Sequence, residues 1–214
     1  RSIIVGACQV SIMKQKEKTE RTRERIIDAA VRVFGKKGYT AATIGEICSE
    51  YGIAKGLLYH NFEGKSELYL ACVSRCFAEV TAYLKAQKIE TDLQQYMKQR
   101  MQYFSDHPLY AGIFFEAVLQ PPAGMETEIK KRRTDFDEFN QSIYREAISR
   151  LKLRDGITEE TALEYYAIIQ EMFNGYFSSP AYAGKDFKVK IADHEEKLVQ
   201  MLDILLYGLA EKER

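Results

Sequence analysis

The sequence is poor in the residues on which most catalytic and metal sites depend. Its 214 residues include no Trp and only three His and four Cys. It also has no Gly-rich phosphate loop, no GxSxG motif and no HExxH motif, so the common signatures of nucleotide, ester and zinc-dependent chemistry are missing. We therefore expect no enzyme and no cofactor, and we interpret His107 and His194 as ordinary surface or helix-capping residues.

The four cysteines, Cys8, Cys48, Cys72 and Cys76, show no CxxC pattern. Cys72 and Cys76 lie one helical turn apart, which leaves a two-ligand metal or redox site open, although Cys is more often a small core residue. We predict no metal site and a reducing, cytoplasmic setting.

Long apolar runs are also missing from the sequence. A membrane-spanning helix needs about 20 apolar residues, and no such run occurs. We interpret residues 1–18 as an N-terminal extension, in which residues 1–13 (RSIIVGACQVSIM) are apolar and Met13 is a candidate natural start. Residues 14–25 (KQKEKTERTRER) mix both charges and fit either a solvated helix or an arm that contacts phosphates.

Charge is balanced overall but unevenly distributed along the chain. The formal net charge is zero, and the 46% hydrophobic and 29% charged residues fit an ordinary folded protein. Residues 1–85 carry 14 Lys and Arg against 9 Asp and Glu, whereas residues 86–214 carry 17 against 22. The N-terminal part therefore holds a basic surplus that would attract phosphate groups.

The stretch from Thr43 to Phe62 (TIGEICSEYGIAKGLLYHNF) predicts two short helices joined by a tight turn. Thr43 and Glu46 form a capping-box pattern at the start of the first helix, and Gly52 suits the left-handed conformation that ends it. Apolar residues recur at helical spacing on the inner face. The outer face of the second helix then suits insertion into a DNA major groove.

From Gly38 to Leu68 the sequence resembles the DNA-binding domain of TetR-family transcriptional regulators. The matching positions, all in register, are Gly38-Tyr39, Thr43, Ile47, Gly52, Lys55-Gly56, Tyr59, Phe62, Lys65 and Leu68. Cys48 and Tyr51 stand where the family usually has Ala, and Ala54 stands where it usually has Ser. Ala is a poorer helix N-cap than Ser by about 1 kcal/mol, so we expect a looser second helix in the free protein.

The resemblance and the positions at helix ends together predict two sets of DNA contacts. The predicted phosphate contacts are Tyr39, Thr43, Tyr59 and Lys65, and the predicted base contacts are Lys55, Gly56, Leu57 and His60. Gly56 would permit close backbone approach, and Leu57 would offer an apolar contact to a thymine methyl group.

The rest of the chain shows helical periodicity without strands, which predicts an all-α fold. We expect a helix-turn-helix DNA-binding domain over residues 19–64, led by a helix over 19–37, and a linking helix over 65–85. A helical ligand-binding and dimerisation domain should follow over 86–214. Pro and Gly breaks divide it into helices over 91–104, 108–119, 125–152, 158–177 and 187–211.

The C-terminal domain is rich in aromatic residues, which form either an ordinary core or a pocket for a largely apolar ligand. The predicted pocket residues are Tyr96, Met101, Tyr103, Phe104, Tyr110, Phe114, Phe139, Tyr144, Tyr165 and Phe173. The basic run Lys130–Arg133 fits either an anion site or a solvated helix face.

Two apolar seams on the last helices fit either burial within one subunit or a four-helix dimer interface, which the family resemblance favours. The predicted interface residues are Leu163, Tyr166, Gln170, Phe177, Leu198, Leu202, Leu205 and Leu209.

Together these features predict a dimeric, ligand-responsive DNA-binding regulator in the cytoplasm. We expect a repressor that binds a double-stranded palindromic operator and is released by a small-molecule effector. The alternative is a helical interaction module whose helix-turn-helix binds a protein partner.

Overall fold

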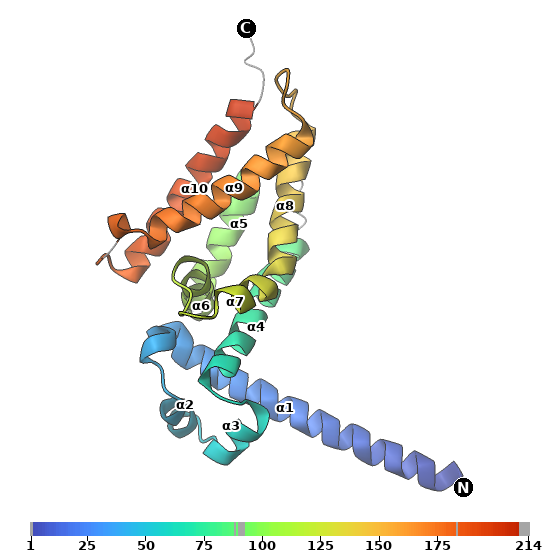
Figure 1. The fold of residues 1–214 in the computed structure, drawn as a ribbon. Coiled ribbons are helices and arrows are strands. Elements are labelled where there is room, and N and C mark those ends of the chain that lie inside the picture. The colour runs from blue at the N-terminus through green and yellow to red at the C-terminus, as the bar shows by residue number, and fades with distance from the viewer. Residues whose placement is uncertain (1, 88, 90–92, 183, 210–214) are drawn as a thin grey trace. The chain divides into compact units, whose positions relative to one another are not determined.

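The computed structural model describes residues 2–87, 89, 93–182 and 184–209, with side chains from residue 16 to residue 208. Within these ranges every regular element is helical and none is a strand, which confirms the predicted all-α fold (Figure 1). The elements are α1 (Ser2–Ala41), α2 (Ile44–Glu50), α3 (Lys55–Asn61), α4 (Lys65–Ala86), α5 (Leu93–Asp106), α6 (Pro108–Leu119), α7 (Glu126–Arg132), α8 (Thr134–Ser149), α9 (Glu159–Ser178), the 3-10 turn η1 (Pro180–Tyr182) and α10 (Phe187–Leu209). Over the described residues, none of these helices is long and apolar enough to cross a lipid bilayer.

The chain divides into two compact units, residues 1–72 and residues 73–214, with the boundary inside α4. In the first unit α1 packs against α2, and α2 packs against α3. Ile26 and Phe34 of α1 and Ile47 of α2 are almost fully buried in this core. Residues 2–18 continue α1 towards the N-terminus, and Gly38, with φ 74°, interrupts the helix where the sequence predicts its end.

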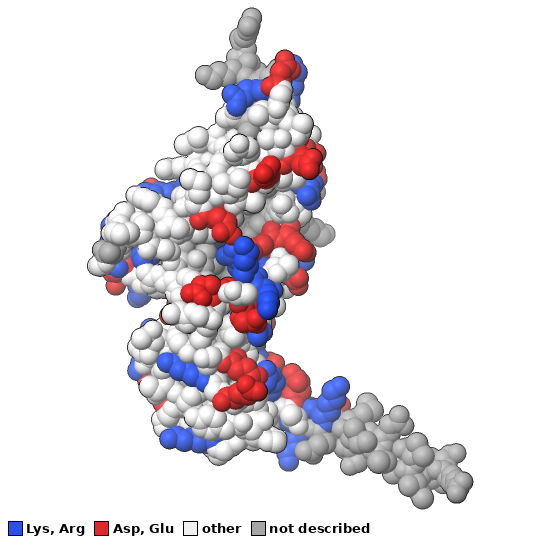
Figure 2. Space-filling model, viewed as in Figure 1, with Lys and Arg blue, Asp and Glu red and all other residues white. Residues whose placement is uncertain are grey.

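In the second unit α9 packs against α8, α10 and α6. The core contains a cluster of phenylalanine rings, in which Phe114 contacts Phe77, Phe104 and Phe136 with ring centroids 4.7 to 5.2 Å apart. On the face drawn in Figure 2, acidic and basic side chains of this unit lie interleaved rather than sorted into separate patches. Charged groups here therefore have opposite charges close by.

The helix predicted over 125–152 is instead two helices, α7 and α8. They are separated at Arg133, which has φ −96° and ψ 2°. The hydroxyl of Thr134 donates to the carbonyl oxygens of Lys130 and Lys131, at 3.4 and 3.0 Å. Side-chain bonds of this kind compete with helix continuation, and apolar periodicity does not register them. The other predicted helices are present; the predicted start at residue 91 and end at residue 211 lie outside the described residues.

The cysteines whose side chains are described, Cys48, Cys72 and Cys76, are buried, as expected of core residues. The thiol of Cys76 lies 3.3 Å from the carbonyl oxygen of Tyr110, and that of Cys72 lies 3.9 Å from the carbonyl oxygen of Ile27. Cys8 lies outside the described side chains. Where side chains are described, no three His, Cys, Asp or Glu residues gather as metal ligands.

Candidate functional site

The two short helices predicted around Gly52 are α2 and α3. Thr43 precedes α2 in an extended conformation, and its hydroxyl oxygen accepts a hydrogen bond from the backbone N–H of Glu46 at 3.1 Å. The carboxylate of Glu46 forms an ion pair with Lys37 of α1. Gly52 has φ 61°, and Ile53 behind it is buried. The sequence signals for a helix-turn-helix thus correspond to contacts that fix the turn.

Helix α3 presents an open face to solvent. Leu58 is fully buried, whereas Leu57 is 41% exposed and Tyr59 is 55% exposed. The residues predicted to contact bases are all exposed, namely Lys55, Gly56, Leu57 and His60. This face is available for contact with a partner.

The start of α3 carries no side-chain cap. Ala54, at the N-cap position, forms no such hydrogen bond, as its side chain predicts. A Cβ atom added at Gly56 would meet nothing within 4 Å. Internal packing therefore does not require glycine at this position, whereas a closely approaching partner would.

Two of the predicted phosphate contacts, Tyr39 and Lys65, lie side by side. The ammonium of Lys65 lies 4.4 Å from the centre of the Tyr39 ring and 3.3 Å from the carbonyl oxygen of Thr40. The hydroxyl of Tyr39 hydrogen bonds with Ser66 at 2.9 Å. The other two, Thr43 and Tyr59, are exposed. Ser66 joins this group although no sequence pattern indicates it.

Two arginines of α1 hold the motif in place. The guanidinium of Arg23 donates to the carbonyl oxygen of Asn61 at 2.7 Å and lies 4.1 Å from the centre of the Phe62 ring. Arg25 lies 3.4 and 3.3 Å from the carbonyl oxygens of Tyr51 and Gly52. The sequence predicts Arg25 in a solvated or phosphate-contacting segment and does not indicate this role, because the carbonyl partners are far away in the sequence.

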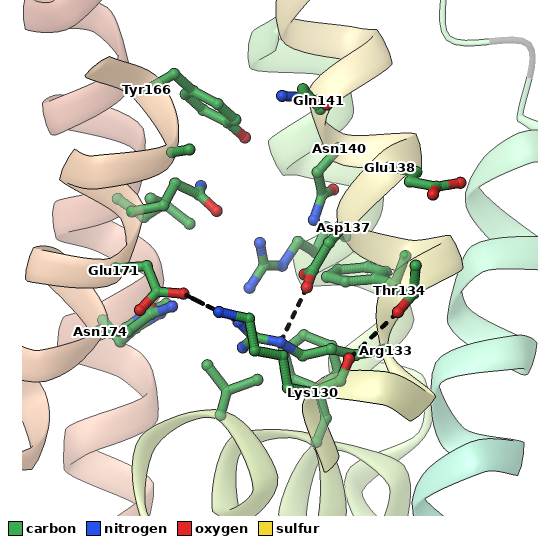
Figure 3. A pocket seen from close by; sticks show the side chains of 18 residues that line it. Lys130, Arg133, Thr134, Asp137, Glu138, Asn140, Gln141, Tyr166, Glu171 and Asn174 are labelled. Carbon is green, nitrogen blue, oxygen red and sulfur yellow. Dashed lines mark hydrogen bonds and ion pairs between the residues drawn. The ribbon is translucent and has the colours of Figure 1, made fainter. Parts of the chain in front are cut away.

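The second unit contains a cavity of about 320 Å³ between α8 and α9, with α7 at one end (Figure 3). Its apolar wall includes Phe114, Phe136 and Leu198, all buried. Lys130 and Arg133 of the basic run reach its rim, where Lys130 pairs with Glu171 at 3.3 Å and Arg133 pairs with Asp137 at 3.0 Å. The run thus divides between the cavity rim and the solvated helix face.

A buried polar network forms the floor of this cavity. Arg100 donates to the carboxylate of Glu195 at 3.0 Å, and Nδ1 of His194 lies 3.0 Å from the same oxygen. Because a carboxylate only accepts, Nδ1 carries the proton. Nε2 of His194 lies 3.0 Å from the side-chain amide of Asn174 on α9. The network links α5, α9 and α10.

The charges of this network follow from burial and from neighbouring groups. Burial is the largest influence on both Arg100 and Glu195, and it opposes their charges. Their mutual attraction, together with the effect of Tyr96 on Arg100 and of His194 on Glu195, outweighs burial, so the pKa of Arg100 is raised and that of Glu195 is lowered. Burial lowers the pKa of His194, although Glu195 opposes that shift. The prediction that His194 is a surface residue was therefore wrong: only 1% of it is exposed. His107 lies exposed before α6, as predicted.

The predicted ligand-pocket residues are scattered. Phe114 lines the cavity; Met101 and Phe104 line a more open hollow of about 650 Å³ between α5, α6 and α10. Tyr144 stacks on Tyr166 with ring centroids 4.0 Å apart, and Tyr165 is 54% exposed. The others pack against neighbours and do not line this cavity: Tyr96, Tyr103, Tyr110, Phe139 and Phe173. An aromatic residue type does not show whether a ring faces a cavity or the core.

Most of the predicted dimer residues lie inside the subunit. The buried ones are Leu163, Tyr166, Phe177, Leu198 and Leu202. A partner cannot reach these side chains, so the apolar seam identified the face that packs within the unit. Gln170 lines the cavity, Leu205 is half-buried, and the side chain of Leu209 lies outside the described part.

The opposite face of α9 is exposed and apolar. The large hydrophobic residues on it are Tyr165, Ile168, Met172 and Tyr176. Met172 is 69% exposed, and Ile204 of α10 is 71% exposed. We refer to these four α9 residues together with Ile204 and Tyr207 as the α9–α10 face. Apolar faces of this kind are typical of protein interfaces.

Sequence comparison assigns both units. Residues 26–72 match the profile of bacterial regulatory proteins of the tetR family, and residues 87–210 match that of the tetracyclin repressor-like C-terminal domain. The chain belongs to the TetR family. The profile that its first unit matches describes bacterial regulatory proteins.

Relatives and solved structures extend the similarity along most of the chain. The HTH-type transcriptional regulator YerO of Bacillus subtilis is 27% identical over 198 residues, which make up 88% of this chain and 65% of YerO. The chain thus spans less than two thirds of that relative. A TetR-family structure from Pectobacterium atrosepticum superposes with TM-score 0.61 and 20% identity, covering 92% of this chain and 98% of that chain. The structure of FadR of Bacillus subtilis, in complex with stearoyl-CoA, superposes with TM-score 0.58 and 17% identity, covering 87% of this chain and 98% of that chain. Both structures show the shared fold.

Proposed function

We propose that this regulator is a repressor that binds a palindromic operator as a dimer and leaves it when a small molecule binds. The observation that carries the proposal is the open face of α3. Lys55, Leu57 and His60 are exposed there, and Gly56 leaves space for a close approach that internal packing does not use. A helix offered in this way suits the major groove. Such a protein would act in the cytoplasm, where operator DNA lies.

Dimerisation is supported by the α9–α10 face. One short recognition helix reads few base pairs, so two helices related by two-fold symmetry multiply specificity. A face that exposes Met172 and Ile204 to 69% and 71% suits contact with a second copy of the chain.

Release by a ligand is supported by the cavity between α8 and α9. A ligand shifts the population away from the DNA-competent state by its preference for the other state. A 100-fold release needs about 2.7 kcal/mol of differential affinity, which a few buried contacts supply.

The test is binding of the purified protein to double-stranded DNA from around its own coding region, measured by fluorescence anisotropy across a salt series. Tight, specific binding of one dimer per site, weakening steeply with salt, is the expected result. Absent or salt-insensitive binding by the folded protein, after unfolding and refolding to remove carried ligand, would instead favour a helix-turn-helix that contacts a protein partner.

Two variants separate positioning from base reading in this assay. Lys65→Ala should weaken binding to every sequence and reduce the salt slope by about 0.9, because one phosphate contact is lost. Lys55→Ala should change the preference among operator bases. An unchanged slope would remove Lys65 from the phosphate contacts, and uniform weakening would remove Lys55 from the base contacts.

A further inference from the structure

The cavity between α8 and α9 has a buried polar floor beneath an apolar wall. Arg100 and Asn140 are 5% and 6% exposed, and both line the cavity beside the rings of Phe114 and Phe136. Polar groups this deeply buried are costly unless they find partners. The lining therefore suits a ligand that is largely apolar but presents one polar group to the floor.

The floor offers hydrogen-bond donors. Nε of Arg100 is buried and has no hydrogen-bond partner among the described residues. The side-chain oxygen of Asn140 accepts a hydrogen bond from the Tyr96 hydroxyl, so its NH2 group remains to donate. A guanidinium and an amide NH2 both need acceptors, and a carbonyl oxygen is the smallest group that supplies one.

The charges around the cavity are already neutralised in pairs. Arg100 faces Glu195, Arg133 faces Asp137, and Lys130 faces Glu171. Glu138 points away from the cavity in Figure 3. A carboxylate on the ligand would find each of these three cations already paired with an anion. The Arg100 guanidinium lies 5.3 Å from the centre of the Phe114 ring in the cavity wall. A cation on the ligand would therefore be repelled by Arg100. Unpaired buried charge is strongly unfavourable.

The size of the cavity limits the ligand further. Its volume of about 320 Å³ is at the lower end of the range of roughly 300 to 1,000 Å³ for ligand pockets. A long acyl chain carrying an anionic head group fits neither the volume nor the charge.

We infer that the cavity binds a compact, uncharged molecule with an apolar body and a carbonyl oxygen that accepts hydrogen bonds from Arg100 and Asn140. Its role as the effector rests on the proposed function, but its binding does not. The inference is narrower than the largely apolar ligand that the sequence predicts, because it adds one acceptor and excludes net charge.

The test uses four probes that share one body and differ in one group. They are 4-hydroxyacetophenone (neutral carbonyl), 4-hydroxybenzoate (anion), 4-hydroxybenzylamine (cation) and 4-ethylphenol (no acceptor at that end). Calorimetric titration of the full-length protein without DNA should show the ketone binding at least about tenfold more tightly than the other three, the factor expected for a hydrogen bond to a charged donor. Stearoyl-CoA should not compete with the ketone. Equal or tighter binding of any other probe, or no binding of the ketone, overturns the inference.

Two variants locate the binding and test the charge argument. Ala167→Phe fills the cavity from α9, where Ala167 lines it and is exposed, and should abolish ketone binding. Glu171→Gln frees Lys130 and should raise the affinity for 4-hydroxybenzoate about threefold, as expected for one exposed charge. Glu164→Gln, an exposed change on α9 outside this cavity, is the matched control. It should change neither the affinity for the ketone nor the affinity for 4-hydroxybenzoate. Ketone binding that survives Ala167→Phe, or a Glu171→Gln protein that gains no anion affinity, overturns the assignment.

The calorimetric titration and the DNA assay test the ligand inference and the proposed function separately. If the ketone binds in the cavity but leaves DNA affinity unchanged, the ligand chemistry holds and the proposed release mechanism fails. If DNA binding is confirmed but the anion binds as tightly as the ketone, the regulator stands and this inference is overturned.

Discussion

At the scale of single residues, Ala54 sets how firmly the recognition helix begins. It occupies the N-cap of α3 with φ −64° and ψ 131°, and it forms no side-chain hydrogen bond there. Ser in this extended conformation would accept a bond from a free backbone N–H group of the first turn. We predict that Ala54→Ser raises the free energy of unfolding of the first unit by about 1 kcal/mol, measured by native-state hydrogen exchange of the α3 amides.

Ala54→Val is the matched control for this prediction. Its side chain is larger but has no acceptor, so protection of α3 should not increase. If Ser and Val have the same effect, the gain does not come from capping.

His194 couples stability to pH. Its buried ring, which faces Glu195 and Arg100, has a pKa below the ordinary value of 6.5, whereas the unfolded chain protonates near that value. Below about pH 6.5 the unfolded state therefore binds more protons than the native state, so the free energy of unfolding falls as pH falls, by up to about 1.4 kcal/mol per unit. The lowered pKa of Glu195 acts in a separate, more acidic window.

We predict that His194→Gln flattens the pH dependence between pH 7 and about pH 5. The free energy of unfolding is measured at several pH values by urea titration, with circular dichroism as the signal. His107→Gln, at the exposed start of α6, should keep the wild-type slope. A wild-type protein whose stability does not change over this range would contradict the assignment.

At the scale of elements, α3 depends on α1 for its position. Arg23 holds the last turn of α3 through the carbonyl oxygen of Asn61, at 2.7 Å, and also pairs with Glu67 at 3.8 Å. A charge-assisted hydrogen bond of this kind contributes roughly 1.5 to 3 kcal/mol. We predict that Arg23→Met lowers DNA affinity about tenfold for every operator sequence, measured by anisotropy, because α3 is less well positioned.

Arg21→Met removes the same charge from an exposed position two residues earlier on α1. The two variants should change the salt slope of DNA binding equally. Only Arg23→Met should also lower DNA affinity at high salt. If both variants behave alike, Arg23 acts as a charge and does not position α3.

The elements differ in how far the sequence predicts them. The turn at Gly52 and the cap at Thr43 depend on residues within a few positions, so their residue types are sufficient. The break at Arg133 was missed because it depends on the Thr134 hydroxyl inside an otherwise periodic stretch. Leu57 is exposed, and its contact with a base stays a prediction.

At the scale of the whole molecule, the α9–α10 face is the surface through which we propose that two copies associate. Met172 lies on it, 69% exposed, and a carboxylate placed there would be buried without a partner in a dimer. We predict that Met172→Glu shifts the protein to monomer at micromolar concentration in sedimentation experiments. The variant should also lose most of its operator affinity, because the two half-sites would then be bound independently.

Met101→Glu is the control, since Met101 is a similarly open methionine of the same unit, 47% exposed on α5. It should remain dimeric. A Met172→Glu protein that remains dimeric would show that another surface joins the subunits.

The sequence predicts this larger organisation only in part. Periodicity along α9 and α10 identified an apolar seam, but it cannot show whether the seam is covered by the same chain or by another one. The cavity floor was missed for a related reason. Arg100, Asn174 and His194 come from three helices far apart in the sequence, and each one alone has no pattern that indicates a site.

The stacked tyrosines allow a change between α8 and α9 to be followed without an added label. Tyr144 of α8 and Tyr166 of α9 lie nearly parallel, 11° apart, and Tyr166 lines the cavity. Two rings so close couple their electronic transitions, and the chain has no Trp whose absorption would cover them. The near-ultraviolet circular dichroism of the unmodified protein should therefore report whether α8 and α9 separate when a ligand enters or DNA is released.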